Sequence, residues 1–404
     1  MSKSADDDEY PRNAAEQLVL DAVASRRLAD LFTLPEADRR LSADFLQYLI
    51  DGAREVLRVP LRIRGATITG PLRPPLGIRE GSRAAVQFRE CEFDSPVDLS
   101  GAEFLMLQFV DCTLPAFIGA SISVSADLDL SGSQFAGVTD YESELTDVGS
   151  CSIHLKHARI GGKLDLSASD NQRFSAVGTI RLDGSHVDGD VSLAGATLDG
   201  RGEPALSARS AIVGSNVDLC TVAEYRFEAM GEVIFAASEI AGDLNCEGAR
   251  LSSPNGRAMH CEDLEVESVF LLKSRRLNIP FEAHGRLNFL TAVISGSFFM
   301  TNARLLPGPD YEGVLKKGGP VAINLQQARI SNALAFSNIG EVTDDGVASL
   351  DGEPKPVEGW FLLTGTQMTT VIDHVDTGWP SAGYLDIDGA IYSDVRHYGD
   401  GDLT

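Results

Sequence analysis

The sequence predicts an all-β protein, a right-handed parallel β-helix (β-solenoid) of about 27 residues per coil with a small N-terminal helical cap. Three observations predict this fold. A segment recurs at a regular interval, apolar residues lie two positions apart within it, and glycine stands at its centre.

The repeated segment has the pattern A-x-I-x-G-x-L-x-L. Seven copies begin at Ala158, Ser185, Ala211, Ser238, Leu264, Ala292 and Ala328. Their first residues are 27, 26, 27, 26, 28 and 36 positions apart, and the last step is long because a polar Gly/Pro-rich loop insertion occupies residues 306–320. Weaker copies extend the array in both directions, so the predicted solenoid covers residues 59–393.

The pattern of each copy predicts short strands joined by bends. Leu164 and Leu166 lie on one side of a strand because alternate residues share a face. The central glycine, Gly162 in this copy, is expected to let the backbone bend between two strands without a Cβ. We expect three such strands per unit. Such a unit cannot bury its apolar side alone, so the coils must stack, at about 4.8 Å per coil.

The N-terminal region carries the one helical pattern. Residues 1–10 are acidic and are predicted to be disordered, and residues 11–58 are predicted to form a cap of two helices, over 12–32 and 36–57. The residues at helical spacing are Leu41, Phe45, Leu46, Leu49 and Ile50. A terminal coil needs covering because it exposes apolar core and an unpaired strand edge. The alternative role for this apolar stripe is binding another helix.

The C-terminal end lacks an amphipathic cap. Residues 394–404 are predicted to form a tail that follows a repeat-like strand directly. Two explanations stay open at this point. Either the loop around residues 373–383 covers the last coil, or the chain continues in nature.

Composition restricts the class of partner. The chain has 59 acidic and 34 basic residues and a net charge of −25, which argues against direct binding to nucleic acid or to an anionic membrane surface. The N-terminus has no apolar signal segment, and no apolar run reaches the roughly 18 residues of a membrane span. The six cysteines show no CxxC spacing and are typical of reduced, buried thiols in a cytoplasmic protein.

One acidic position recurs between the apolar residues of the strands. It is occupied by Asp98, Asp129, Asp165 and Asp218, and alternation is expected to turn these side chains outward. They can form an acidic face that meets a cation or a basic partner. The interpretation that we favour is simpler: they are solvated strand residues that discourage edge-to-edge aggregation. Ser192, Leu271 and Phe299 interrupt the predicted row.

Other candidate chemistry is weak, and no catalytic, cofactor-binding or metal site is predicted. His154 and His157 have HxxH spacing, but residues three apart on a strand point to opposite faces, as do the neighbours His260 and Cys261. No GxGxxG, GxxxxGK[ST] or GxSxG motif is present. One mixed set of charges was considered for a β-helix glycosidase or lyase site. It consists of Lys163, Arg181, Asp183 and Asp188.

The repeat resembles that of a bacterial family. Residues 157–167 (HARIGGKLDLS) and 240–249 (IAGDLNCEGA) are similar to the unit GARIGGDLDLSGA of mainly actinobacterial proteins labelled "membrane-associated oxidoreductase". Residues 88–102 (FRECEFDSPVDLSGA) resemble the segment that precedes the regular repeats in that family. The resemblance extends from about residue 40 to 393 and implies a β-helix, which in many relatives precedes a linker and hydrophobic helices. No motif here supports the oxidoreductase label.

These observations predict a non-enzymatic solenoid scaffold that binds a protein partner or associates with itself. The expected location is the cytoplasm, either free or at the inner face of the membrane through a segment or partner outside this chain. Two alternatives stay open. One is an acidic, DNA-mimicking protein similar to pentapeptide-repeat proteins, and the other is a β-helix carbohydrate-active enzyme.

Overall fold

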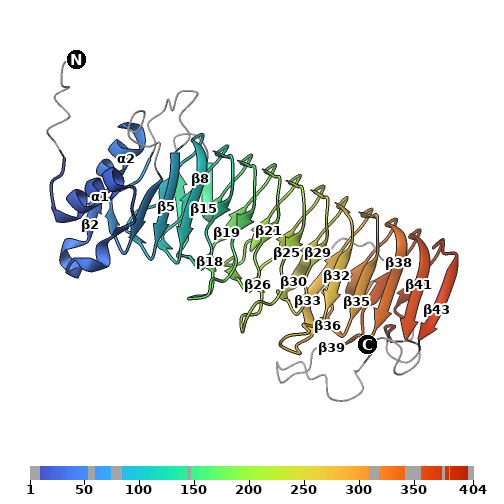
Figure 1. Cartoon of the computed structure of the whole chain (residues 1–404). Coiled ribbons are helices and arrows are strands. Elements are labelled where there is room, and N and C mark those ends of the chain that lie inside the picture. Colours follow the sequence, from blue (N-terminus) through green and yellow to red (C-terminus); the bar gives the residue numbers. More distant parts are fainter. Residues whose placement is uncertain are drawn as a thin grey trace.

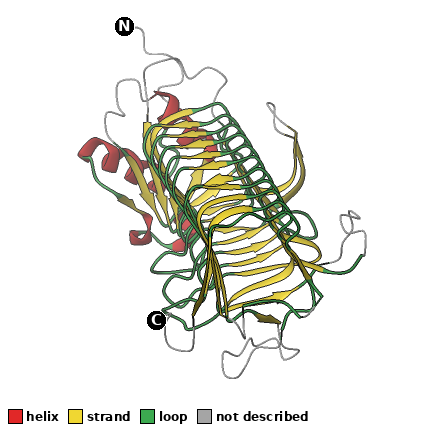
Figure 2. Ribbon diagram, turned by 90° about the vertical axis from the view of Figure 1, so that its right-hand side faces the viewer, coloured by secondary structure: helices red, strands yellow, loops and turns green. Residues whose placement is uncertain are grey.

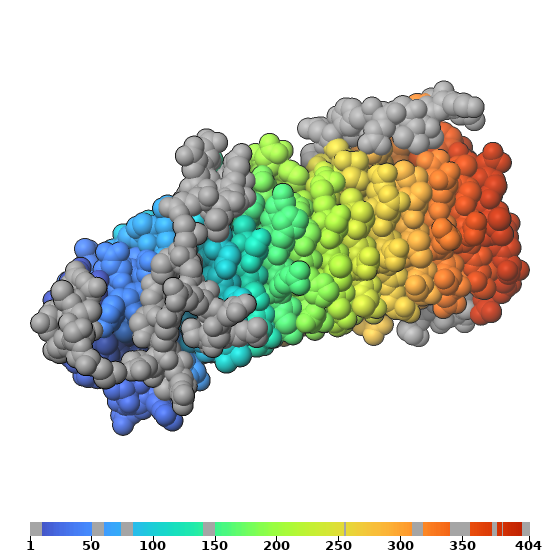
Figure 3. Space-filling model, turned by 90° about the horizontal axis from the view of Figure 1, so that it is seen from above, coloured from blue at the N-terminus to red at the C-terminus, as the bar shows by residue number. Residues whose placement is uncertain are grey.

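Short parallel strands, stacked coil upon coil, build most of the molecule, as the computed structural model shows (Figures 1 and 2). The structure describes residues 10–52, 60–73, 84–142, 147–308, 318–341, 356–374, 378–381 and 383–398. The predicted fold class, an all-β parallel β-helix with a small N-terminal helical cap, is confirmed. Its inward side chains form one continuous apolar core from the cap to the C-terminal coils, inside an elongated body (Figure 3).

Each regular coil contains four short strands, and not the predicted three. The coil that begins at Ala158 has β16 (Arg159–Ile160), β17 (Leu164–Asp165), β18 (Ser175–Val177) and β19 (Thr179–Arg181). Gly178 divides the last two, with a φ of 96°. A Cβ at this position would lie 3.1 Å from the backbone carbon of Cys151 in the neighbouring coil, so the division needs glycine.

The first two strands of each coil belong to a 21-stranded sheet. It begins with β1 (Ala29–Asp30), β3 (Leu61–Arg64), β5 (Ala84–Arg89) and β8 (Glu103–Val110). One half then continues through β11 (Ser123–Val124), β16, β20 (His186–Val187), β24 (Ile212–Val213), β28 (Glu239–Ile240), β31 (Glu265–Val266) and β34 (Val293–Ile294). The other continues through β12 (Leu128–Asp129), β17, β21 (Val191–Ser192), β25 (Val217–Asp218), β29 (Leu244–Asn245), β32 (Val269–Leu272) and β35 (Phe298–Thr301). Both halves join in β38 (Arg329–Ser337) and β41 (Gln367–His374), and β43 (Asp394–Tyr398) follows.

The last two strands of each coil belong to a 22-stranded sheet on the opposite side of the core. One half contains β2 (Arg40–Ser42), β4 (Thr67–Thr69), β6 (Glu92–Phe93), β9 (Thr113–Leu114), β13 (Gln134–Phe135), β18, β22 (Thr197–Asp199), β26 (Glu228–Met230), β36 (Ala303–Leu306) and β39 (Gly340–Glu341). The other contains β7 (Val97–Asp98), β10 (Phe117–Ile118), β15 (Asp147–His154), β19, β23 (Leu206–Ser207), β27 (Val233–Ile234), β37 (Val321–Asn324), β40 (Trp360–Leu362) and β42 (Leu385–Asp386). The long strands β30 (Arg250–His260) and β33 (Phe281–Asn288) span both halves, and β14 (Val138–Glu142) pairs antiparallel with β15.

The central glycine of the repeat serves close packing between coils. Neither Gly162 nor Gly242 has a positive φ. A Cβ at Gly162 would lie 2.2 Å from Asp127 Oδ1, and one at Gly242 would lie 2.3 Å from Asn216 Oδ1. The sequence analysis expected a backbone bend at this position. The structure shows instead that glycine leaves room for a polar side chain of the preceding coil, which accepts a hydrogen bond from the backbone N–H of the residue after the glycine.

The repeat has a second period of two coils. At one inward corner, large and small residues alternate along the solenoid. They are Phe174, Ala196, Phe227, Ala249, Phe281 and Ala303. The phenylalanines are 53 and 54 residues apart, so two coils form the unit that repeats. The alternation keeps the core filled because Phe227 and Phe281 each lie between two alanines.

The helical cap is shorter than predicted. Helix α1 (Ala14–Ser25) ends where Arg26 adopts a left-handed conformation, and α2 (Ala43–Gly52) begins after Ser42, whose hydroxyl accepts from the backbone N–H of Phe45. Between α1 and α2, the predicted helical residues instead form the 3₁₀ turns η2 (Leu31–Thr33) and η3 (Glu36–Asp38) and the strands β1 and β2. Residues 53–57, the end of the second predicted helix, lie outside the described residues. These strands pair with β3 and β4, because the edge of the first coil offers unpaired backbone groups.

The limits of the solenoid therefore lie outside the predicted residues 59–393. Among the described strands it runs from β1 at Ala29 to β43 at Tyr398, so the predicted tail 394–404 begins with a strand that pairs with β41. Strand β36 ends at Leu306 and β37 starts at Val321, at the limits of the predicted insertion. Most of the predicted N-terminal tail and residues 399–404 lie outside the described residues.

Candidate functional site

Three of the four predicted aspartates form one outward row on the 21-stranded sheet. Asp129 is in register with Asp165, Asp165 with Ser192, and Ser192 with Asp218. We call Asp129, Asp165, Ser192, Asp218 and Asn245 the aspartate row. Along the sheet, the row is preceded by Gln87 and Gln108 and followed by Phe270, Phe299 and Ala335.

The prediction that Asp98 shares this face is wrong. Asp98 lies in β7 of the opposite, 22-stranded sheet, where it is in register with Ile118 and is buried. The same V/L-D-L-S-G motif marks the end of a strand in both sheets, with a positive-φ glycine at Gly101 and again at Gly132. The motif therefore identifies a turn without showing which sheet precedes it.

The row residues shape the turns that follow their strands. Asp129 Oδ1 accepts from the backbone N–H of Ser131 at 3.0 Å, and Asp165 Oδ1 accepts from that of Ser167 at 3.1 Å. Asn245 makes the same contact with Glu247, also at 3.1 Å. Because asparagine serves as well as aspartate, the carboxylate is required for its acceptor oxygen and not for its charge. This gives the recurring acid a structural role that the sequence analysis did not predict.

The row is half-buried, which changes its electrostatics. Burial raises the pKa of Asp129, and Asp165 in the next coil adds to this effect. Burial also raises the pKa of Asp218, partly offset by the Asn245 amide, which donates to Asp218 Oδ1 at 3.2 Å. Lys163 Nζ lies 2.7 Å from Asp165 Oδ2. Asp129 and Asp218 therefore take up a proton at a higher pH than a fully solvated aspartate does.

Two phenylalanines continue the row. The rings of Phe270 and Phe299 are stacked, with centroids 5.5 Å apart and planes at 5° to each other, and both are half-buried. We call them the aromatic pair. The prediction that Leu271 interrupts the row is wrong, because this coil has one residue fewer before its second strand and Phe270 takes the outward position beside Asn245. Leu271 faces the core.

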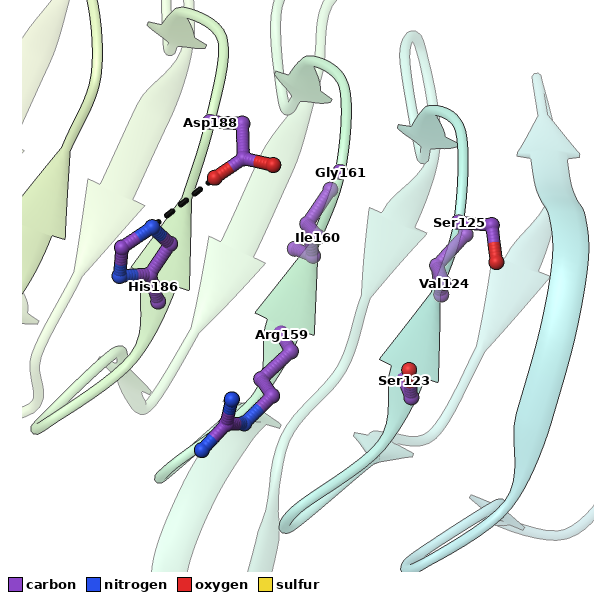
Figure 4. Close-up of a pocket in the computed structure, with 8 residues that line it drawn as sticks. All are labelled: Ser123, Val124, Ser125, Arg159, Ile160, Gly161, His186 and Asp188. Atoms are coloured by element: carbon purple, nitrogen blue, oxygen red, sulfur yellow. Dashed lines mark ion pairs between the residues drawn. The ribbon is translucent and has the colours of Figure 1, made fainter.

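A groove crosses three coils on the other half of the same sheet (Figure 4). It measures about 380 Å³ and is lined by Ser123, Val124, Ser125, Arg159, Ile160, Gly161, His186 and Asp188. Ser123, Arg159 and His186 lie in register on β11, β16 and β20. His186 Nε2 is 2.9 Å from Asp188 Oδ1, while the Arg159 guanidinium has no partner among the described residues. The outward residues at equivalent positions of the aligned repeats are the sequence signal that could have identified these lining residues.

The groove does not assemble a hydrolytic site. Ser123 lies two coils from His186, roughly 10 Å by strand spacing, so the histidine cannot activate its hydroxyl. Asp188 is the one carboxylate among the lining residues, whereas glycoside hydrolysis usually needs two at a defined separation. The mixed set considered from the sequence is also dispersed: Arg181 is on β19 in the 22-stranded sheet, whereas Lys163 and Asp188 adjoin β17 and β20 in the other sheet.

The 22-stranded sheet carries a second charged row, which the sequence analysis missed. Glu228, Arg250, Glu282 and Arg304 follow one another in register, and we call them the charge ladder. Arg250 Nε donates to Glu282 Oε2 at 2.7 Å. Arg226 Nη1 donates to Glu282 Oε1 at 3.1 Å, and Arg173 Nη2 donates to Glu228 Oε2 at 3.0 Å. The signal that could have found it is the two-coil period, because Glu228 and Glu282 are 54 residues apart, as are Arg250 and Arg304.

The remaining sequence candidates are dispersed or inert. His154 is buried and its pKa is lowered to about 4 by that burial, whereas His157 lies exposed in a turn. Burial raises the pKa of both Cys151 and Cys220 to about 12, so these thiols are poor nucleophiles near neutral pH. Cys220 is half-buried and Cys246 faces the core, as predicted from their register.

Within the described ranges, His, Cys, Asp and Glu side chains form no group of three or more that could hold a metal ion. Among the helices that the structure describes, none combines the length and apolarity needed to cross a membrane. The chain matches no family model, no curated protein and no solved structure. The resemblance to the family labelled "membrane-associated oxidoreductase" therefore stays a prediction.

Proposed function

We propose that this protein is a non-enzymatic scaffold whose 21-stranded sheet binds a protein partner along its outer face. The observation that carries the proposal is one continuous row in which carboxylates give way to the aromatic pair. Asp165 and Phe270 are four coils apart, roughly 19 Å at the usual strand spacing. An extended segment of about six residues spans that length.

The chemistry of the row defines the partner. Asp165 and Asp218 suit basic side chains, and the aromatic pair suits an apolar or guanidinium group placed against its exposed ring surface. Charge attraction steers such a partner toward the row, while the half-buried rings supply apolar contact that salt does not screen. A segment with basic residues at one end and an apolar residue at the other fits both parts.

The proposed location is the cytoplasm, either free or at the inner face of the membrane through a partner. All six cysteines are free, and five of them are buried. This supports a reducing compartment, since secreted proteins usually pair their cysteines. Membrane association, in this proposal, comes from the bound partner or from a segment outside this chain.

The test is affinity capture from the native host, read by mass spectrometry, with matched variants as bait. Asp165→Asn/Asp218→Asn removes two charges from the row and keeps the acceptor oxygens that the turn after Asp165 and the Asn245 amide use. Glu92→Gln/Glu203→Gln removes two charges elsewhere on the surface and serves as the control. Phe299→Ser tests the apolar part.

We expect wild type and the control to capture the same protein, and the row variants to capture at least about tenfold less, as about 1.4 kcal/mol of lost binding energy implies. Equal capture by all baits, or no reproducible partner, would contradict the proposal.

A further inference from the structure

The two ends of the solenoid are finished differently (Figure 1). At the N-terminal end, α1 packs on β1, β2 and β3, and α2 packs on β2. At the C-terminal end, β42 pairs with β40 and β43 pairs with β41, and among the described strands neither has a neighbour on its other side. Within the part of the chain that the structure describes, the last coil thus presents two unpaired strand edges, which are templates for further pairing.

The apolar core also reaches the surface at this end. Leu385, Ile387 and Val395 are 37%, 49% and 39% exposed. Their counterparts one coil earlier, Phe361, Leu363 and Val371, are 0%, 2% and 8% exposed. Ile391 and Tyr392 add further exposed apolar surface. In the described part of the 373–383 loop, Trp379 packs edge-to-face on Phe336 and donates to Asp373 at 2.7 Å. It borders a hollow of about 150 Å³ that Leu385, Ile387 and Val395 also line, so this part of the loop does not cover the exposed apolar residues.

We propose that the last coil is a self-association surface, on which a second copy of this chain stacks end to end about a two-fold axis. The inference rests on the proposed scaffold function and deepens it, because it names a second copy as one partner. A head-to-tail arrangement is blocked, since α1 and α2 cover the N-terminal coil. The remaining symmetric arrangement joins two C-terminal ends, which closes the assembly as a dimer.

The charges on β43 fit this arrangement. In an antiparallel pair centred on Val395, that residue meets Val395 of the second copy on the core side. Asp394 and Arg396 flank it on the outer side, because Val395 is in register with the core-facing Val371. Within one copy, Arg396 Nε donates to Asp394 Oδ2 at 2.9 Å. In the dimer Asp394 also lies opposite Arg396 of the second copy, and the two-fold axis generates this pair twice. Opposite charges at directly paired positions stabilise an antiparallel ladder.

The decisive experiment measures mass in solution by sedimentation velocity with three single variants of the full chain. Wild type is expected to sediment as a dimer. Asp394→Arg places two cations opposite each other, and Arg396→Asp places two anions opposite each other, so each variant alone is expected to dissociate at least about tenfold more readily. Mixed together, the two variants are complementary at both positions, and a dimer is expected to reappear. Leu105→Glu, at an exposed position remote from the last coil, is the control that stays dimeric.

Circular dichroism of each variant verifies folding. A wild type that stays monomeric across micromolar concentrations, or single variants that fail to recombine, overturns the inference. Either result leaves the proposed partner-binding face to be judged by capture with the Asp165→Asn/Asp218→Asn bait, so failure of one proposal is distinguishable from failure of the other.

Discussion

The aspartate row and the charge ladder run along the same solenoid, yet they use their charges differently. In the charge ladder, Glu282 lies between Arg250 and Arg304 of the coils before and after it, and it is buried, with Arg226 as a further partner. In the aspartate row, Asp129 and Asp165 accept from turn N–H groups, and the carboxylates stay half-exposed. The two-coil period explains the difference: it brings opposite charges together in one sheet, and in the other it places the neutral Ser192 and Asn245 next to Asp218.

The largest expected effect on stability comes from removing the Glu282 carboxylate. Glu282→Ala leaves Arg226 and Arg250, whose side chains are 13% and 34% exposed, without the buried carboxylate that they share, and breaking a buried ion pair costs up to about 3–5 kcal/mol. We expect a clearly lower unfolding midpoint in urea and in heat. Glu239→Ala is the matched control, because Glu239 is exposed on the other sheet, and its midpoint is expected to stay within about 0.5 kcal/mol of wild type. Equal effects of the two substitutions would show that the ladder is not a stabilising network.

A smaller effect is expected at Asp165. Asp165→Ala removes the acceptor of the Ser167 backbone N–H and hydroxyl, and we expect a loss of about 1 kcal/mol in the free energy of unfolding. Asp165→Asn keeps an acceptor oxygen, as Asn245 does in its own coil, and is expected to recover most of that stability. If alanine and asparagine destabilise equally, the ion pair with Lys163, and not the turn, is what matters.

The smallest expected effect is on the pH dependence of stability, which distinguishes the aspartate row from fully exposed acidic residues. Because burial raises the pKa of Asp129 and Asp218, the folded state holds their protons at a higher pH than the unfolded state does. Their contribution to stability is therefore greatest below about pH 3.8 and is lost as the pH rises through the folded-state pKa. Asp129→Asn/Asp218→Asn is expected to be slightly more stable than wild type near neutral pH, with a difference that disappears in acid.

Asp190 is a control for that titration, because its pKa is shifted in the opposite direction. A hydrogen bond from the Ser215 side chain lowers its pKa, so its contribution is present above the unfolded-state pKa and is lost as the pH falls through the folded-state pKa. Asp190→Asn is expected to be less stable than wild type near neutral pH. Urea midpoints measured from pH 3 to pH 7 compare the two variants directly. Parallel pH curves for both would contradict the assigned pKa directions.

The sequence by itself determined the solenoid, because a repeat of about 27 residues with inward residues two apart can bury its apolar side by stacking. It also located the helical stripe of the cap and the acidic position of the strands. The features that the sequence did not predict arise from contacts with a neighbouring coil. The fourth strand is separated at Gly178 by a contact with Cys151, and β1 and β2 replace predicted helix because the first coil offers a strand edge.

Only the tertiary structure decided which sheet each motif enters and which charges become neighbours. Asp98 and Asp129 occupy the same local motif, and only the pairing of their strands separates a buried aspartate from a half-exposed one. Likewise, Arg250 and Glu282 are 32 residues apart in the chain and 2.7 Å apart in space. Local residue types set the strands and turns, whereas the register between coils set the charge ladder, the aspartate row and the open last coil, because these arise from contacts between residues of different coils.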